Sequence, residues 1–133
     1  GGARGAAETN QIKLMWEESP PCGVSGSPRE VRQALDNLLA NAVAYAPPKS
    51  VVRVSLSTTD DQVRVVVQND GEGIPEHERE AIFEPFHRGP GSHDGGQGLG
   101  LAIVRDIALR HGGNARVLEA GEGVQIALEL ART

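Results

Sequence analysis

The sequence predicts an α+β fold, a two-layer sandwich in which about five strands form one sheet and about three helices pack against it. Valine-rich stretches alternate apolar and polar residues, two other stretches repeat apolar residues at helical spacing, and the 133 residues fit a single domain. Only four residues are aromatic, so aliphatic side chains must form the core. We expect a folded domain over residues 11–133, after a tail at 1–10 that is disordered or a remnant of cloning.

The first third of the chain predicts a strand followed by a long helix. Residues 11–16 alternate polar and apolar side chains, and Val24 is a candidate for a very short strand. A helix is expected over 28–45, because Ser27 can cap it, a proline occupies its first position and Glu30 would complete a capping box. A Pro-Pro pair ends this helix, and apolar residues recur along it at positions 31, 34, 35, 38, 39, 42 and 43.

The middle of the chain predicts a hairpin and then a loop-rich segment. Residues 51–57 and 62–68 are rich in valine, alternate in polarity and are joined by a four-residue turn. A short helix is expected over 76–82. Residues 87–98 are expected to be a loop, because five of these twelve residues are glycine, and ordering such a backbone without a ligand is entropically costly.

The last third predicts a helix and a second hairpin. The helix should run from about 99 to 111, and we expect it to be buried because it is apolar on most faces. Gly112 and Gly113 should end it. Strands are expected over 114–118 and 123–130.

Composition and motifs exclude several classes of protein. The net charge of −5 disfavours nucleic-acid binding, and the single cysteine, Cys22, cannot form an internal disulfide. No stretch of 18 apolar residues is present, and no signal peptide. The P-loop is absent because no lysine follows a glycine, and the spacing of the 96–100 glycines does not fit a dinucleotide-binding fingerprint. Zinc and serine-hydrolase signatures are also missing.

Three features could together hold a nucleotide. The glycine-rich loop leads through Gly98 and Gly100 into a helix, whose free N–H groups attract anions. Asn37 and Asn41 are one helical turn apart, and a carboxamide oxygen suits Mg²⁺. Asp70 follows a strand and could accept a hydrogen bond from an amine such as that of adenine. Taken singly, each is also typical of ordinary structure: a flexible connector, a solvated amide pair and an Asp-Gly turn.

In this order, the motifs resemble those of the catalytic and ATP-binding domain of two-component sensor histidine kinases. That family shares its ATP-binding (Bergerat) fold with DNA gyrase B, the Hsp90 chaperones and MutL. Asn37-Leu38-Leu39-Ala40-Asn41-Ala42 is similar to the N box, and Asp70-Gly71-Glu72-Gly73-Ile74 to the DxGxG box. Ile82-Phe83-Glu84-Pro85-Phe86 is similar to the F box, and the segment from Gly96 to Ala102 to the second glycine box. The resemblance covers residues 11–131 and implies a mixed sheet with helices on one face.

The resemblance also implies roles for individual residues. Asn41 would bind Mg²⁺ bridging the phosphates of ATP, with Asn37 and Tyr45 near the nucleotide. Asp70 would bind adenine, in a pocket lined by Gly71, Gly73 and Ile74. Residues 87–97 would form a mobile lid hinged beside Phe83 and Phe86. The phosphates would be contacted by Arg88 and by the glycine box, whose binding residues are Gly96, Gln97, Gly98, Leu99, Gly100 and Leu101.

Asn37 favours the kinase branch of this group. The gyrase and Hsp90 branches carry a glutamate at this position as the base that activates water, and an amide cannot serve as that base. Two alternatives stay open: a slow ATPase, and a nucleotide-sensing module without phosphotransfer. Ala44, Ser27 and Gln97 depart from residues common in the family, and these departures bear on ATP affinity.

The acceptor histidine is expected on another domain. The family places it in an H-E-x-x-[TN]-P segment of dimerisation helices, and His77 and the residues after it fail this pattern. The resemblance therefore implies that the chain takes ATP and Mg²⁺, phosphorylates dimerisation helices of the same full-length protein, and serves a response regulator downstream. It implies a monomeric cytoplasmic domain without membrane contact of its own, within a protein of the plasma membrane.

Overall fold

The computed structural model describes residues 12–16, 22–71, 73–85, 100–118 and 123–133. They form five strands, two α-helices and two short 3₁₀ helices. The strands are β1 (Lys13–Trp16), β2 (Val51–Thr58), β3 (Gln62–Asn69), β4 (Asn114–Leu118) and β5 (Val124–Ala131). The helices are α2 (Pro28–Tyr45), α3 (Gly100–Arg110), η1 (Glu76–Glu78) and η2 (Ala81–Phe83).

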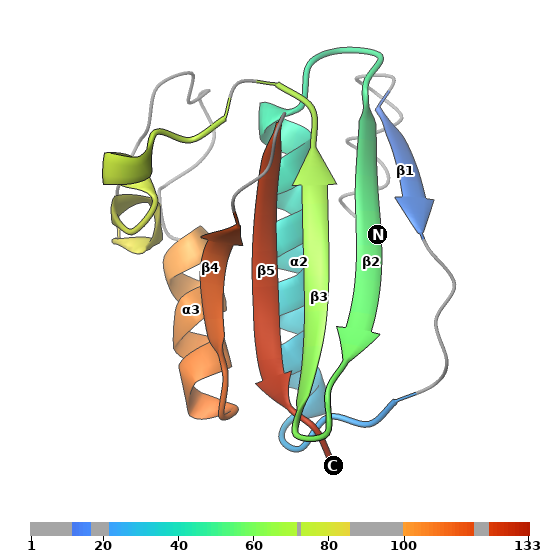
Figure 1. Ribbon diagram of the computed structural model, residues 1–133, viewed down its shortest axis with the longest axis vertical. Helices are drawn as coiled ribbons and strands as arrows, with labels where there is room; N and C mark the ends of the chain where they lie inside the picture. The colour runs from blue at the N-terminus through green and yellow to red at the C-terminus, as the bar shows by residue number, and fades with distance from the viewer. Residues whose placement is uncertain (1–11, 17–21, 72, 86–99, 119–122) are drawn as a thin grey trace.

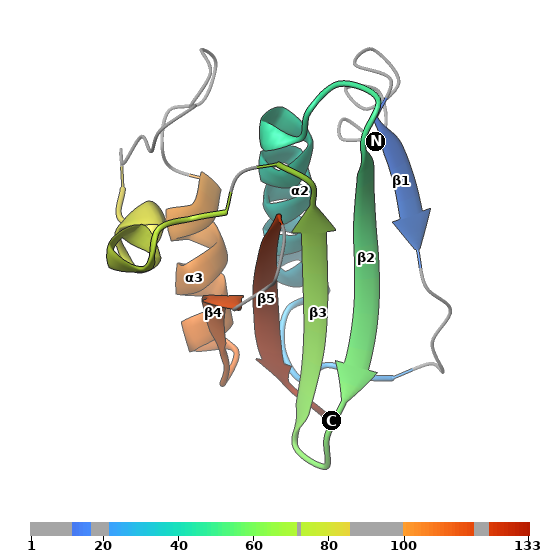
Figure 2. The same cartoon turned by 45° about the horizontal axis from the view of Figure 1, so that its top comes forward.

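The five strands form one mixed sheet in the order β1-β2-β3-β5-β4. β1 pairs in parallel with β2, and all other neighbours are antiparallel. Both views of the ribbon show α2 and α3 on the same face of the sheet (Figures 1 and 2). The expected two-layer α+β sandwich with a mixed sheet is therefore confirmed. Among the residues described, no helix has the length and apolar composition needed to cross a membrane.

The core lies between the sheet and the two helices and is almost wholly aliphatic. Alternate residues of β2, β3 and β5 face the helices, and the register places Val67 between Val54 and Ile126. Leu38 of α2 and Ile107 of α3 are fully buried against them. Of the aromatic residues described, only Phe83 is buried, so the expectation of an aliphatic core is confirmed.

Most predicted elements match the structure. α2 has the bounds 28–45, both hairpins are present, β1 starts two residues later than expected, and α3 covers 100–110 of the predicted 99–111. Val24 forms an isolated bridge to Arg132. A Schellman motif terminates α3. Gly112 has a left-handed φ of 75°, and the Gly113 N–H donates to Ala108 O at 2.9 Å.

Two predictions about helices were wrong. The expected helix over 76–82 is a pair of 3₁₀ turns, η1 and η2, because this segment has no apolar repeat long enough to sustain an α-helix. α3 is not buried on most faces: Asp106 and Arg110 are exposed, and Leu109 is 57% exposed. α3 packs on α2, on β4 and β5 of the sheet and on η2, and its remaining face is exposed.

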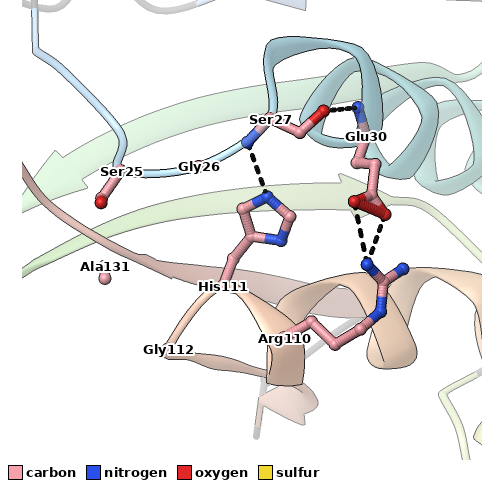
Figure 3. A pocket seen from close by; sticks show the side chains of 8 residues that line it. All are labelled: Ser25, Gly26, Ser27, Glu30, Arg110, His111, Gly112 and Ala131. Carbon is pink, nitrogen blue, oxygen red and sulfur yellow. Dashed lines mark hydrogen bonds and ion pairs between the residues drawn. The ribbon is translucent and has the colours of Figure 1, made fainter.

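The predicted capping box at the start of α2 is half formed. The Glu30 N–H donates to Ser27 Oγ at 3.2 Å, as expected. The reciprocal bond is missing, since the Ser27 N–H donates to His111 Nε2 at 3.1 Å. The Glu30 carboxylate instead accepts from Arg110, with Nη1 2.9 Å from Oε1 (Figure 3). A contact between two helix ends thus replaces a contact within one helix.

The face of the sheet without helices carries one buried carboxylate. Glu129 of β5 is 2% exposed, although this face is open to solvent. Arg64 Nη2 lies 2.6 Å from Glu129 Oε2, and Arg116 Nη2 lies 2.7 Å from Oε1. The two arginine side chains on the neighbouring strands cover the carboxylate and neutralise it.

Candidate functional site

The described candidate residues gather at one end of the sandwich. α2 ends and β3 ends at the same end of the molecule, and α3 begins toward that end (Figure 1). Asn41 and Tyr45 lie on the last turns of α2, Asp70 follows β3, and Gly100 starts α3. A Cβ built at Gly71 would lie 3.7 Å from Tyr45 O, so the loop after β3 lies against the end of α2. Motifs that are 30 to 60 residues apart in sequence thus share one end of the fold.

The polar residues of α2 line one edge of its buried face. Asn37 and Asn41 are partly buried and Tyr45 is 40% exposed, at a spacing of four residues. Their neighbours Leu38 and Ala42 are buried in the core. Because i, i+4 and i+8 lie along one side of a helix, the three side chains form a row beside the core. The amide oxygens of this row can contact a ligand without any change in the packing of the core.

Asp70 is exposed and its backbone is fixed from two sides. The buried Asn69 donates its side-chain amide to Asp70 O at 3.0 Å. Gly71 follows with φ of 126°, a conformation that favours glycine. Gly123 packs on the other side, and a Cβ there would lie 2.4 Å from Asn69 O. The carboxylate is therefore solvent-accessible on a rigid support, as a ligand-binding group needs to be.

Gly123 supports the Asp70 loop, and the sequence motifs did not predict this role. Its φ of 74° and its contact with Asn69 both require glycine. The pairing of Asn69 with Val124 at the end of the β3–β5 ladder brings Gly123 to this place. The glycine at the start of the strand expected over 123–130 was a signal in the sequence, but the partner of that strand was not.

Residues 73–85, termed the wall, follow the loop after β3 and pack against α3 through η2. Ile74 is partly buried, and its carbonyl accepts from Arg79 Nε at 3.3 Å. Phe83 is 4% exposed, under the guanidinium of Arg105. Arg105 also binds Glu80, and this hydrogen bond together with the arginine charge lowers the pKa of that exposed carboxyl. The wall contains no α-helix or strand, so side-chain contacts hold it.

The first turn of α3 leaves space beside Gly100. A Cβ built on this glycine would meet no atom of the described residues within 4 Å. Its φ is not left-handed either, so neither packing nor backbone conformation requires glycine there. Leu101, by contrast, is buried in the core. Gly100 stands at a helix N-terminus, where the first backbone N–H groups have no partner within the helix.

Part of the predicted site lies outside the described residues. It comprises the lid at 87–97 with Phe86, Arg88, Gly96 and Gln97, and the glycine-box residues Gly98 and Leu99. For these residues the predictions stay predictions.

A pocket of about 470 Å³ lies at the other end of α2 and contains none of the predicted site residues. His111 and Arg110 from the end of α3 and Glu30 from α2 point into it (Figure 3). The hydrogen bond and charge of Glu30 help to raise the pKa of Arg110. The hydrogen bond between Ser27 and His111 could not be predicted from the sequence, because 84 residues separate the two.

Comparison with known proteins agrees with the geometry. Residues 26–133 match the family described as histidine kinase-, DNA gyrase B- and HSP90-like ATPases. The chain is 40% identical over 107 residues to the sensor-type histidine kinase PrrB of Mycobacterium leprae, which covers 79% of this chain and 23% of PrrB. It is 37% identical over 127 residues to the sensor histidine kinase CusS of Escherichia coli O157:H7, which covers 93% of this chain and 26% of CusS.

A structural relative shows the same fold. The mycobacterial sensor histidine kinase MprB superposes with a TM-score of 0.86 and 32% identity, over 97% of this chain and 90% of that one. The chain spans about a quarter of the length of the curated relatives it matches.

Proposed function

The chain belongs to the family of histidine kinase-, DNA gyrase B- and HSP90-like ATPases, and from this premise we propose that it binds Mg-ATP and donates the γ-phosphoryl group to a histidine. Its sequence relatives are sensor histidine kinases, which supports the kinase branch of the family. The acceptor would be a histidine on the dimerisation helices of the full-length protein. A response regulator would take the phosphoryl group from that histidine.

The observation that carries this proposal is the convergence of three motifs at one end of the fold. A partly buried amide on α2, an exposed carboxylate after β3 and an open glycine at the start of α3 come together there. The carboxylate suits the amino group of a base, and the helix N-terminus suits phosphates. Among the described residues, neither a close contact nor a left-handed backbone requires glycine at position 100, which supports a close approach of a ligand to the backbone there.

The residues fit a magnesium ion that arrives with the nucleotide. The described residues contain no group of three or more histidine, cysteine, aspartate or glutamate side chains that could hold a metal by themselves. Mg²⁺ binds hard oxygen ligands and usually keeps waters and phosphate oxygens, so one amide oxygen from Asn41 is a sufficient protein contribution. When bound, the ion would neutralise charge on the phosphates.

In the proposed reaction, the protein positions ATP and stabilises charge. Asp70 accepts a hydrogen bond from the adenine amino group, with Gly73 and Ile74 beside the ring. The first N–H groups of α3 bind phosphate oxygens. The bond between the γ-phosphorus and the ADP oxygen breaks, and a P–N bond forms to the acceptor imidazole, whose proton leaves to a base outside this chain. Asn37 cannot deprotonate water, so transfer to water is expected to be slow.

Phosphotransfer can be tested with the acceptor supplied as a separate protein. The chain, Mg-ATP labelled at the γ-phosphate and the dimerisation helices of the full-length protein should give acid-labile, base-stable label on the helices. Rapid release of phosphate without the helices would favour the ATPase alternative. Nucleotide binding without either product would favour the sensing module.

The magnesium role of Asn41 gives a separate prediction. Asn41→Ala removes the amide oxygen from a partly buried helix position, where alanine is a good helix former. We expect Mg-ATP binding to weaken about tenfold, with ATP binding in excess EDTA nearly unchanged. The matched control is Gln33→Ala, which removes an exposed amide from the same helix. Calorimetric titration with and without Mg²⁺ measures the difference, and an equal loss in both conditions would contradict the ligand role.

A further inference from the structure

Arg105 of α3 contacts both η2 and β4. It lies on α3, one and a half turns after Gly100, and its side chain is 22% exposed. Its guanidinium carbon lies 4.1 Å from the centre of the Phe83 ring. Nη1 donates to Glu80 Oε2 at 2.6 Å, and Nε and Nη2 donate to Ala115 O of β4 at 3.2 and 2.8 Å. Every nitrogen of the guanidinium is thus engaged.

The wall at residues 73–85 depends on these contacts. Two 3₁₀ turns are its only regular structure, and it has no strand ladder to hold it to the sheet. η2 packs on α3, where the Phe83 ring lies under Arg105. Planar stacking with simultaneous donation to a carbonyl and a carboxylate is a geometry that arginine provides and that lysine only partly reproduces.

The same wall and the same helix carry the two sides of the proposed nucleotide site. Gly73 and Ile74 begin the wall directly after the Asp70 loop, and Gly100 begins α3. A contact that fixes η2 on α3 therefore fixes the adenine side of the site relative to the phosphate side. Both ribbon views show η1 and η2 beside α3 (Figures 1 and 2).

We propose that Arg105 is a positioning residue for nucleotide binding, which holds the 73–85 wall against α3 through Phe83 and Glu80, while its bonds to Ala115 O anchor the side chain on β4. The proposal rests on the proposed function for its ligand, ATP. Arg105 touches neither adenine nor phosphate in this account. It sets the distance between the groups that do, so its loss should weaken ATP binding beyond any effect on folding.

Arg110 provides a matched control. It lies on the same helix and likewise forms ion pairs, with Glu30 and Asp106, but at the end of α3 that is far from the site. We expect Arg105→Met to raise the dissociation constant of Mg-ATP about tenfold, and Arg110→Met to change it less than about twofold. Arg105→Lys, which keeps the charge over Phe83, should restore part of the affinity. Calorimetric titration gives the dissociation constants, and thermal unfolding of the free proteins gives their stabilities.

Hydrogen exchange separates this proposal from the proposed function. In the free chain, Arg105→Met should speed amide exchange in peptides from 73–85, and Arg110→Met should not. If the wild type does not bind Mg-ATP, the proposed function fails, and the nucleotide role of Arg105 fails with it even where exchange shows the wall loosened. If the wild type binds and both methionine variants lose affinity in proportion to their stability, Arg105 has only a structural role. Should Arg105→Met not fold, Arg105→Lys and Glu80→Gln carry the test, and unchanged affinity and exchange in both would overturn it.

Discussion

At the scale of single residues, the candidate site depends on glycines that act in two different ways. Gly123 is required by the protein itself, because its left-handed φ and its approach to Asn69 O leave no room for a side chain. Gly100, at the start of α3, is partly buried, but no atom of the described residues lies within 4 Å of a Cβ built on it, and its φ is not left-handed. The first glycine supports the site and the second leaves volume for a ligand, so substitutions at the two should have different consequences.

Gly123→Ala should reduce stability, whereas Gly100→Ala should reduce ligand binding. A methyl group at 123 would lie 2.4 Å from a backbone oxygen that cannot move without disturbing β3. The strained conformation adds about 1–3 kcal/mol to that overlap, so we expect a clear fall in the free energy of unfolding, measured in urea. Gly100→Ala should leave that free energy unchanged or raise it, because alanine is the better helix former. Equal stability of the Gly123→Ala variant would contradict the packing described here.

At the scale of elements, the side chain of His111 links the end of α3 to the start of α2. His111 is 7% exposed; its Nε2 accepts from the Ser27 N–H, so the ring proton sits on Nδ1 and donates to Ile107 O at 2.8 Å. The side chain at the end of α3 thereby satisfies a backbone N–H at the start of α2 and a carbonyl of its own helix. Glu30 and Arg110 add an ion pair beside this contact (Figure 3).

His111→Leu should destabilise the fold without affecting the nucleotide site. The substitution leaves the Ser27 N–H without its acceptor, which costs about 1–3 kcal/mol when the group stays buried. The control is His77→Leu, at an exposed position, for which a change within about 0.5 kcal/mol is expected. Urea unfolding measures both. The affinity of the His111 variant for Mg-ATP should stay at the wild-type value, because His111 contacts Ser27 at the start of α2, whereas Asn41 lies near the end of that helix.

The ion pairs on the face of the sheet without helices predict which substitution there is the more destabilising. Glu129 is buried, whereas the side chains of Arg64 and Arg116 are 42% and 51% exposed. Replacing both arginines with methionine leaves a buried carboxylate without a counter-charge, which costs about 3–5 kcal/mol. Glu129→Met leaves two arginines that water can reach and should cost less. Urea unfolding that ranked Glu129→Met as the more destabilising change would contradict this explanation.

At the scale of the whole molecule, local sequence patterns correctly predicted the elements whose conformation is determined by local interactions. The bounds of α2 follow from a cap, a helical repeat and a Pro-Pro stop, and the first hairpin follows from alternating valines. The segment predicted as a short helix over 76–82 forms two 3₁₀ turns, since it lacks a long apolar repeat. Its contact with Arg105 through Phe83 was not predictable locally, because only the tertiary fold brings the two residues together. The half-formed capping box was missed for the same reason, since the competing acceptor is 84 residues away.

The site divides in the same way. The order of the motifs predicted Asn41, Asp70 and Gly100, and the structure brings them to one end of the sandwich. The residues that support them, Gly123 and Arg105, carry no local signal of that role. They reach the site through the β3–β5 ladder and through the packing of η2 on α3. Sequence motifs therefore pointed to the candidate binding groups, whereas the groups that support them became visible only in the fold.

The central claim is that this fold binds ATP with adenine on Asp70, and a calorimetric titration of Mg-ATP into the wild type and into Asp70→Asn tests it most directly. Asn keeps the shape of the side chain but loses the charge that strengthens the hydrogen bond. Since such a bond is worth about 1.5–3 kcal/mol, we expect binding about ten- to a hundredfold weaker. The control, Asp60→Asn, removes an exposed carboxylate from the β2–β3 turn and should bind like the wild type. Equal affinity of Asp70→Asn and the wild type would contradict the claim.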